Sequence, residues 1–152
     1  MGSNIRKLRQ SFHFAARGVV LCLKNERNFR IHLCAALYAS ALAAIAGFEA
    51  YQYAILFLCF ASVMSTELLN TAIERTCDLI GAEYSTRIKA IKDISAGAVL
   101  IAAFFAFLTG AALFLRREAI DAFLAFSVRP AVLIFVASVP VAVFFIIGKG
   151  KR

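Results

Sequence analysis

Two long apolar runs follow each other in this chain with a single charged residue between them. They cover residues 33–48 and 50–66, and only Glu49 separates them. A chain that crosses a bilayer does so as a helix of ~20 mainly apolar residues, because lipid cannot pair with backbone N–H and C=O groups. The runs therefore predict a tight hairpin of two spanning helices, which extend beyond the uncharged segments to Arg30 and Glu67.

Two further apolar runs follow, at residues 94–115 and 130–148. Hydrophobic residues make up 62% of the chain and its mean hydropathy is +0.80, whereas soluble domains are ~45–50% apolar. This composition excludes an ordinary soluble domain, and we expect an all-α integral membrane protein. The expected units are a core in residues 1–115, with spans at 31–48, 50–70 and 93–115, and an extra transmembrane helix with a basic tail in residues 116–152.

The segment before the first span predicts an amphipathic helix at residues 4–24. Its apolar residues recur every three or four positions, and Arg6, Arg17 and Lys24 lie on another side. Such a helix lies on a membrane surface with its cations toward anionic head groups. Packing against another part of the protein is a compatible alternative. The apolar positions are Ile5, Leu8, Phe12, Ala16, Val19 and Leu23.

The 17 basic residues, which give the chain a net charge of +8, predict its orientation. Seven precede the first span, four lie between the second and third spans, and three lie in the C-terminal tail. Basic residues gather on the cytoplasmic side of membrane proteins, so both termini are expected in the cytoplasm of a bacterial cell, with the protein in the cytoplasmic membrane. The basic residues are dispersed and no aromatic stacking platform accompanies them, so we expect no nucleic-acid partner.

A polar stripe marks the end of the second span. At ~100° per residue, its four side chains share one narrow face of a helix. Carboxylates four residues apart repel each other, and an acid in the bilayer core costs ~2.5–3.5 kcal/mol. A lysine or arginine, a proton or a divalent metal is therefore expected on this face. The simpler alternative is that the acids cap the helix and pair with Arg75, Arg87 or Lys89. The stripe consists of Glu67, Asn70, Glu74 and Asp78.

Two more polar clusters lie on the same side of the membrane. One precedes the first span and contains Glu26, and the other contains Lys92 and Asp93, which we expect at the depth of Glu67. Acids, an amide and a lysine suit phosphoryl transfer, which needs metal, cations and a base near the phosphates. No GxxxxGK[ST] or GxGxxG motif is present in the sequence, so the residues alone predict only a phosphate site at the membrane surface.

At these residues the chain resembles the small integral-membrane lipid kinases of prokaryotes, the diacylglycerol kinase family that includes undecaprenol kinases. The resemblance covers about residues 5–115 and rests on "KNERNFRIH", "ELLNTAIERTCD", "GAEY" and "IKDISAGAVL". It implies ATP- and Mg²⁺-dependent phosphorylation of a lipid alcohol by a homotrimer with shared active sites. His32 and the "FRIH" run look more like undecaprenol kinases, so undecaprenol is favoured and diacylglycerol is the alternative. Arg75 and Thr76 depart from the usual apolar pattern.

The resemblance also implies roles for individual residues. Glu67 is the general base and contacts the substrate, Glu26 and Glu74 bind Mg²⁺, and the motif residues Asn70 and Asp78 support the site. The residues implied for ATP are Lys7, Phe14, Glu26, Glu74, Glu83, Lys92 and Asp93. The residues implied for the lipid, besides Glu67, are Asn28, Phe29, Arg30 and Ala96.

The alternative from another class is a non-enzymatic four-span protein, such as a small transporter or a scaffold. A transporter also uses acids within the membrane, but it more often places them near the bilayer centre, whereas Glu67 follows the end of an apolar run.

Overall fold

The computed structural model describes residues 2–80, 85–127 and 131–148, and these residues form helices with no strand among them. Three of the helices, α2, α3 and α4, are long and apolar enough to cross a membrane, and residues 134–147 form a shorter apolar helix within α6. The expectation of an all-α integral membrane protein is confirmed. The helices are α1 (Gly2–Asn25), α2 (Arg27–Ile45), α3 (Ala50–Leu79), α4 (Thr86–Phe114), α5 (Arg117–Ser127) and α6 (Ala131–Ile147).

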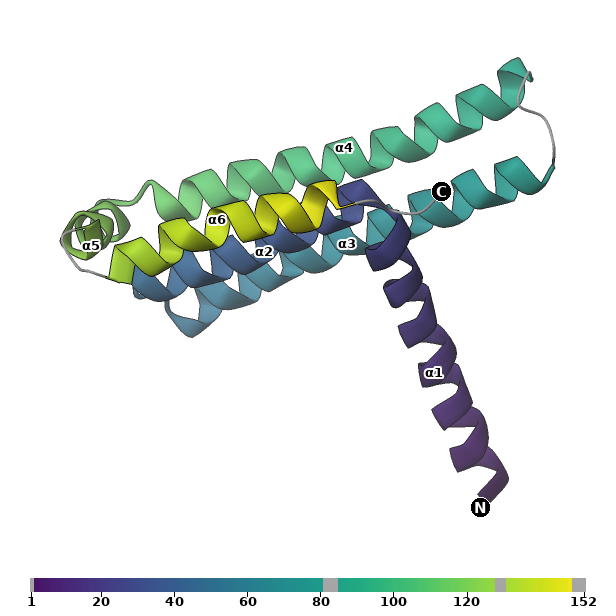
Figure 1. Ribbon diagram of the computed structural model, residues 1–152, viewed down its shortest axis with the longest axis horizontal. Helices are drawn as coiled ribbons and strands as arrows, with labels where there is room; N and C mark the ends of the chain where they lie inside the picture. Colours follow the sequence, from purple (N-terminus) through teal and green to yellow (C-terminus); the bar gives the residue numbers. More distant parts are fainter. Residues whose placement is uncertain (1, 81–84, 128–130, 149–152) are drawn as a thin grey trace.

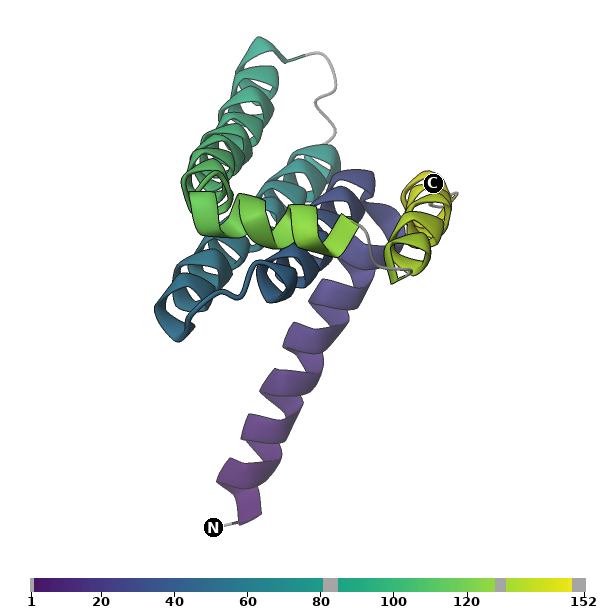
Figure 2. The same ribbon diagram turned by 90° about the vertical axis from the view of Figure 1, so that its left-hand side faces the viewer.

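The spanning helices lie side by side, as Figures 1 and 2 show. Helices α3 and α4 pack along one another, α2 packs on α3, and α6 runs along α2 in the opposite direction. Beyond the start of α2, α3 and α4 continue as a two-helix extension (Figure 1). The polar stripe of the sequence begins level with the start of α2, where Arg75 meets Glu26, and continues toward the end of α3, since the helix runs to Leu79 and not only to residue 70.

The predicted hairpin is confirmed. Helix α2 ends at Ile45, and Gly47 takes a positive φ of 65° that L side chains rarely adopt. Glu49 then caps α3, because its backbone N–H donates to Oε1 of Gln52 at 2.8 Å and its side chain accepts from the Gln52 backbone N–H. Gln52 is only 1% exposed, so this cap is also part of the core.

Helix α5 was not expected from the sequence. It crosses the end of the bundle opposite the α3–α4 extension (Figure 2), with Ala119 fully buried and Phe123 beside Phe114. Arg116 lies over the ring of Phe48, 5.8 Å from its centre. The segment is short and carries charges at its start, so it lacks the apolar run that identifies a span.

Helix α1 is confirmed as a helix, and it points away from the bundle (Figure 1). Residues 4–21 of α1 are exposed and only the last turn meets α2 and α3. The chain changes direction at Glu26, whose backbone is extended with φ −101° and ψ 116°. We call residues 22–30 the α1–α2 elbow.

Candidate functional site

Glu67 occupies the least accessible place in the polar stripe. It is 3% exposed, and its Oε2 atom is buried with no hydrogen-bond partner in the described part of the chain. The neighbouring Asn70 and Thr71 are also buried. A buried charge without a partner is costly, so this carboxylate is not there for stability.

Asn70 connects the stripe to α4. Its Nδ2 donates to Oε1 of Glu74 at 3.0 Å, and its Oδ1 accepts from Oγ of Ser95 at 2.6 Å. Ser95 is itself buried. The amide therefore separates two carboxylates of the stripe and neutralises neither.

Two ion pairs involve the acids of the site. Nη2 of Arg75 lies 3.2 Å from Oε1 of Glu26 and holds the α1–α2 elbow against α3. Nζ of Lys92 lies 2.5 Å from Oδ1 of Asp78, with the two side chains 36% and 62% exposed, and such surface pairs contribute ~0–1 kcal/mol. Pairing with basic residues thus accounts for Glu26 and Asp78, whereas Glu67 has no basic partner among the residues that the structure describes.

Arg75 stands where the family pattern usually has an apolar residue, and its ion pair with Glu26 gives it a structural role. Arg75 pairs with an acid on the elbow, not with one of its own helix. The expected depth of Lys92 is wrong, however. Because α3 and α4 are antiparallel, Ser95 lies level with Asn70, and Lys92 reaches Asp78 farther along α3.

Cys22 of α1 lies inside the same cluster. Burial raises the pKa of its thiol, the nearby carboxylates Glu26 and Glu67 add to this rise, and Thr71 and Arg75 oppose it. The thiol therefore remains neutral at physiological pH. It fills the space between the elbow and α3 without adding charge, a role that sequence spacing did not indicate.

Other predicted residues lie elsewhere. Lys7 and Phe14 are exposed on the projecting part of α1 and do not meet the carboxylates within one chain. Glu83 lies outside the described residues. Asp93 is exposed near the start of α4.

The residues implied for the lipid divide into two pairs. Asn28 and Ala96 are exposed, whereas Phe29 and Arg30 are 2% and 5% exposed. The guanidinium of Arg30 donates to main-chain carbonyls of α1 and of the end of α6. In the described structure these two side chains face the protein.

The two carboxylates implied for metal, Glu26 and Glu74, come from the elbow and from α3. No cluster of three or more His, Cys, Asp or Glu side chains suited to a metal occurs in the described ranges. Mg²⁺ usually takes one or two carboxylates and completes its shell with phosphate and water. The donor set therefore fits a metal that arrives with a nucleotide, and does not fit a resident all-protein site.

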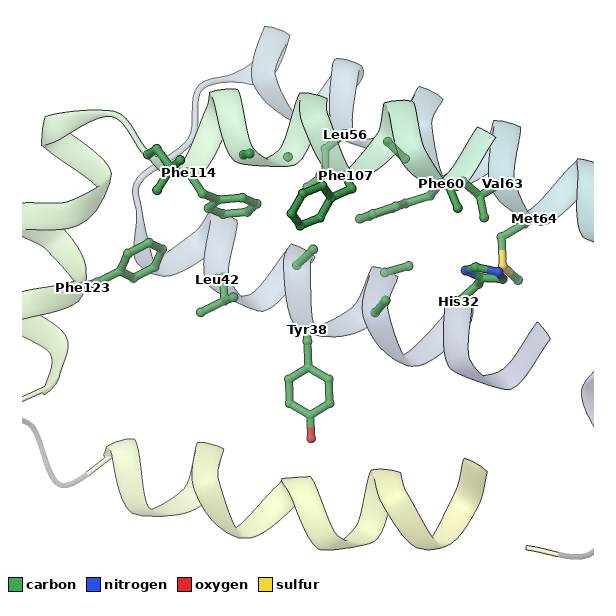
Figure 3. A pocket seen from close by; sticks show the side chains of 18 residues that line it. His32, Tyr38, Leu42, Leu56, Phe60, Val63, Met64, Phe107, Phe114 and Phe123 are labelled. Atoms are coloured by element: carbon green, nitrogen blue, oxygen red, sulfur yellow. The ribbon is translucent and has the colours of Figure 1, made fainter. Parts of the chain in front are cut away.

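An apolar groove of about 630 Å³ runs between α2, α3 and α4. Figure 3 shows His32 and Met64 at one end, and Phe114 with Phe123 of α5 at the other. Met64 precedes Glu67 by about one helical turn in α3, so the groove ends about one turn short of the buried carboxylate. Its lining was missed in the sequence, because apolar residues facing a groove and apolar residues facing lipid have the same pattern.

Comparison with known proteins gives consistent results. The sequence profile described as "Prokaryotic diacylglycerol kinase" matches residues 13–114. The chain is 35% identical to an undecaprenol kinase of Bacillus subtilis over 115 residues, which are 76% of this chain and 94% of the relative. It is 42% identical to a diacylglycerol kinase of Synechocystis over 106 residues, 69% of this chain and 61% of that relative. A diacylglycerol kinase of Escherichia coli is 34% identical over 96 residues, 63% of this chain and 79% of that relative. No solved structure matches significantly.

Proposed function

The chain belongs to the prokaryotic diacylglycerol kinase family and is a lipid kinase, and we propose that it transfers the γ-phosphoryl group of ATP to the hydroxyl of undecaprenol. The observation that carries the proposal is the buried Oε2 of Glu67, which has no hydrogen-bond partner among the described residues and lies about one helical turn beyond the end of an apolar groove. Diacylglycerol is the alternative alcohol. The name of the Bacillus subtilis relative and the "FRIH" run favour undecaprenol.

Glu67 acts as the general base in this proposal. An alcohol is far too weak an acid to lose its proton to a carboxylate beforehand, so the transfer occurs late, as the O–P bond forms. The alcohol oxygen bonds to the γ-phosphorus, the bond to the ADP oxygen breaks, and the hydroxyl proton passes to Glu67. The unpartnered oxygen suits this step, because no donor within residues 2–80, 85–127 and 131–148 competes for its lone pairs.

The groove holds the lipid chain. Its lining is almost entirely apolar, with alanines that leave space between α2, α3 and α4. A chain lying there places its hydroxyl at the His32 end, one turn from Glu67. Burial of the chain contributes binding energy at a distance from the reacting atoms, which fixes the alcohol near the base.

Glu26 and Glu74 would hold Mg²⁺ when the nucleotide is bound, and the metal would supply neutralisation of phosphate charge. Because Glu26 is paired with Arg75 in the structure, it would exchange this bond for the metal, and the guanidinium of Arg75 would then be free to face the phosphates. Asn70 orients Glu74 through its 3.0 Å bond, and Asp78 pairs with Lys92 at the edge of the site.

We place the active site between chains of a homotrimer in the cytoplasmic membrane, with both termini in the cytoplasm. The support is that α1 extends away from its own bundle, so Lys7 and Phe14 are available to a neighbouring chain. Glu83 and Asp93 complete the nucleotide side in this arrangement. Chemical crosslinking in native membranes should capture three copies, and a product limited to two copies contradicts the trimer.

The reaction is tested on purified protein in detergent. With radiolabelled ATP and Mg²⁺, we expect labelled lipid phosphate from undecaprenol, and less from diacylglycerol at equal lipid mole fraction. A preference for diacylglycerol reverses the substrate assignment. If neither alcohol nor any other lipid alcohol gives product across several detergents, the proposed function is wrong.

A further inference from the structure

Helices α5 and α6 follow the part of the chain that the family profile matches, residues 13–114. Helix α6 is nevertheless attached to the α1–α2 elbow by specific polar contacts. Between helices in lipid there is little hydrophobic driving force, so such contacts determine which helices stay together. The question is what the attachment does for the site.

Arg30 makes the main attachment. Its Nη1 donates to the carbonyls of Leu23 and Lys24, at 3.4 and 3.1 Å, in the last turn of α1. Its Nη2 donates to the carbonyls of Ile146 and Gly148, both at 3.1 Å, at the end of α6. One guanidinium thus caps two helix ends, where carbonyls lack partners and carry the negative end of the helix dipole.

The guanidinium of Arg30 is buried, so water cannot replace the carbonyls to which it donates. Arg30 is 5% exposed, and a buried cation is stable only when its donors are satisfied. Four main-chain carbonyls satisfy the two terminal nitrogens, and half of them come from the end of α6. Nε is buried without a partner among the described residues, so the cation depends on these four carbonyls. A second bond, 2.8 Å between the hydroxyls of Tyr38 and Ser138, holds α6 at its middle.

The attachment continues to the carboxylates of the site. The backbone N–H of Arg30 donates to the carbonyl of Glu26 at 3.4 Å, one helical turn earlier, and the Glu26 side chain meets Arg75 of α3. We propose that α6 is a brace, and that Arg30 is a positioning residue through which α6 fixes Glu26 for the metal-bound nucleotide. This inference rests on the proposed kinase function and gives α6 no contact with the reacting atoms.

The test compares Arg30→Gln, Arg30→Lys and the matched control Arg27→Gln in the full-length chain. Arg27 is an exposed arginine at the start of the same helix. Loss of a group that orients a metal ligand costs about 10–100-fold in affinity, so Arg30→Gln should raise the KM for ATP at fixed Mg²⁺ by about tenfold or more, with a smaller change in kcat. Arg30→Lys should restore part of this, and Arg27→Gln should stay near wild type.

The same variants separate the brace from direct lipid binding by Arg30. A brace changes the KM for ATP and leaves the KM for the alcohol nearly constant, whereas lipid binding does the reverse. Binding of a fluorescent ATP analogue with Mg²⁺, measured without lipid, should weaken to the same extent as the KM changes. A rise confined to the KM for the alcohol overturns the inference.

The participation of α6 is tested from its own side. The double variant Phe135→Ala and Ser138→Ala weakens the docking of α6 on α2. It should raise the KM for ATP in the same direction as Arg30→Gln, and the combined effect should be less than the product of the two, since both act through one contact. Fully multiplicative effects contradict a shared brace.

Hydrogen exchange provides a readout that does not depend on catalysis. In Arg30→Gln, peptides covering residues 22–31 and 134–147 should exchange faster together, while α3 and α4 stay protected. Unchanged exchange in the 134–147 peptide overturns the brace even if the enzyme is active. A wild-type protein that phosphorylates no lipid overturns the proposed function, whereas the exchange result still tests the brace.

Discussion

The substitution Glu67→Gln should make the protein inactive and more stable at once. A general base contributes ~10²–10⁴-fold to a rate, which corresponds to about 3–5 kcal/mol of transition-state stabilisation. The amide cannot accept the proton, so kcat for lipid phosphorylation should fall by that factor. ATP binding should remain near wild type, because the roles of Glu26 and Glu74 are unchanged.

The gain in stability follows from the surroundings of Glu67. The carboxylate is 3% exposed, its Oε2 has no partner among the described residues, and Glu74 and Glu26 are close enough to act on it electrostatically. A buried unsatisfied group costs about 1–3 kcal/mol, and more when it is charged. A neutral amide of the same shape removes the charge, so the free energy of unfolding should rise by about 1–2 kcal/mol.

Activity is measured with radiolabelled ATP, and stability by thermal or denaturant unfolding in the same detergent. Glu118→Gln is the matched control, because this acid is exposed at the start of α5, and it should alter neither quantity. Full activity in Glu67→Gln refutes the base assignment. An inactive variant that is also less stable than wild type refutes the argument from burial, because the acid would then be a structural residue.

Two other substitutions examine the polar contacts around the site. Ser95→Ala leaves Oδ1 of Asn70 without the 2.6 Å hydrogen bond. The free energy of unfolding, measured in detergent, should fall by about 1–2 kcal/mol. An unchanged unfolding midpoint contradicts a structural role for this bond. Arg75→Val removes the guanidinium that competes with the metal for Glu26. The Mg²⁺ concentration for half-maximal activity should fall, while the KM for ATP should rise. An increased Mg²⁺ requirement contradicts the exchange of Arg75 for the metal at Glu26.

The fold was largely predictable because lipid imposes strong constraints on sequence. Uncharged runs predicted the spanning helices, and Glu49 between two runs predicted the hairpin. The helix ends were less predictable, since α3 continues to Leu79 through polar and charged residues that follow the apolar run. Helix α5 was missed, because a short amphipathic helix held by Ala119 and Phe123 leaves no long apolar segment.

The site was predictable in part, for a geometric reason. Helical periodicity gathers Glu67, Asn70 and Glu74 on one face of a single helix, and this needs no tertiary information. The partners of that face come from other helices: Ser95 from α4, and Glu26 from the elbow. Their pairing depends on the register between antiparallel helices, which a single sequence does not give, and the same uncertainty led to the wrong depth for Lys92.

The charge balance of the site leads to a last prediction, concerning the metal. Glu67 interacts electrostatically with Glu26 and Glu74, and among the described residues the cation that pairs with one of these three acids is Arg75, which contacts Glu26. Three carboxylates and one guanidinium leave an excess of negative charge, and two unit charges 4 Å apart interact by about 4 kcal/mol near a protein surface. The site should therefore repel ATP that carries no divalent cation.

Removal of Mg²⁺ with a chelator should consequently abolish binding of a fluorescent ATP analogue as well as turnover, and added Mg²⁺ should restore both. Glu74→Gln removes one carboxylate of the cluster. It should weaken binding of the analogue in the presence of Mg²⁺ and relieve part of the repulsion in its absence, so that the difference between the two conditions becomes smaller. Equal affinity with and without Mg²⁺ in the wild-type protein contradicts this reasoning, because it means that the phosphates bind away from the acids of α3.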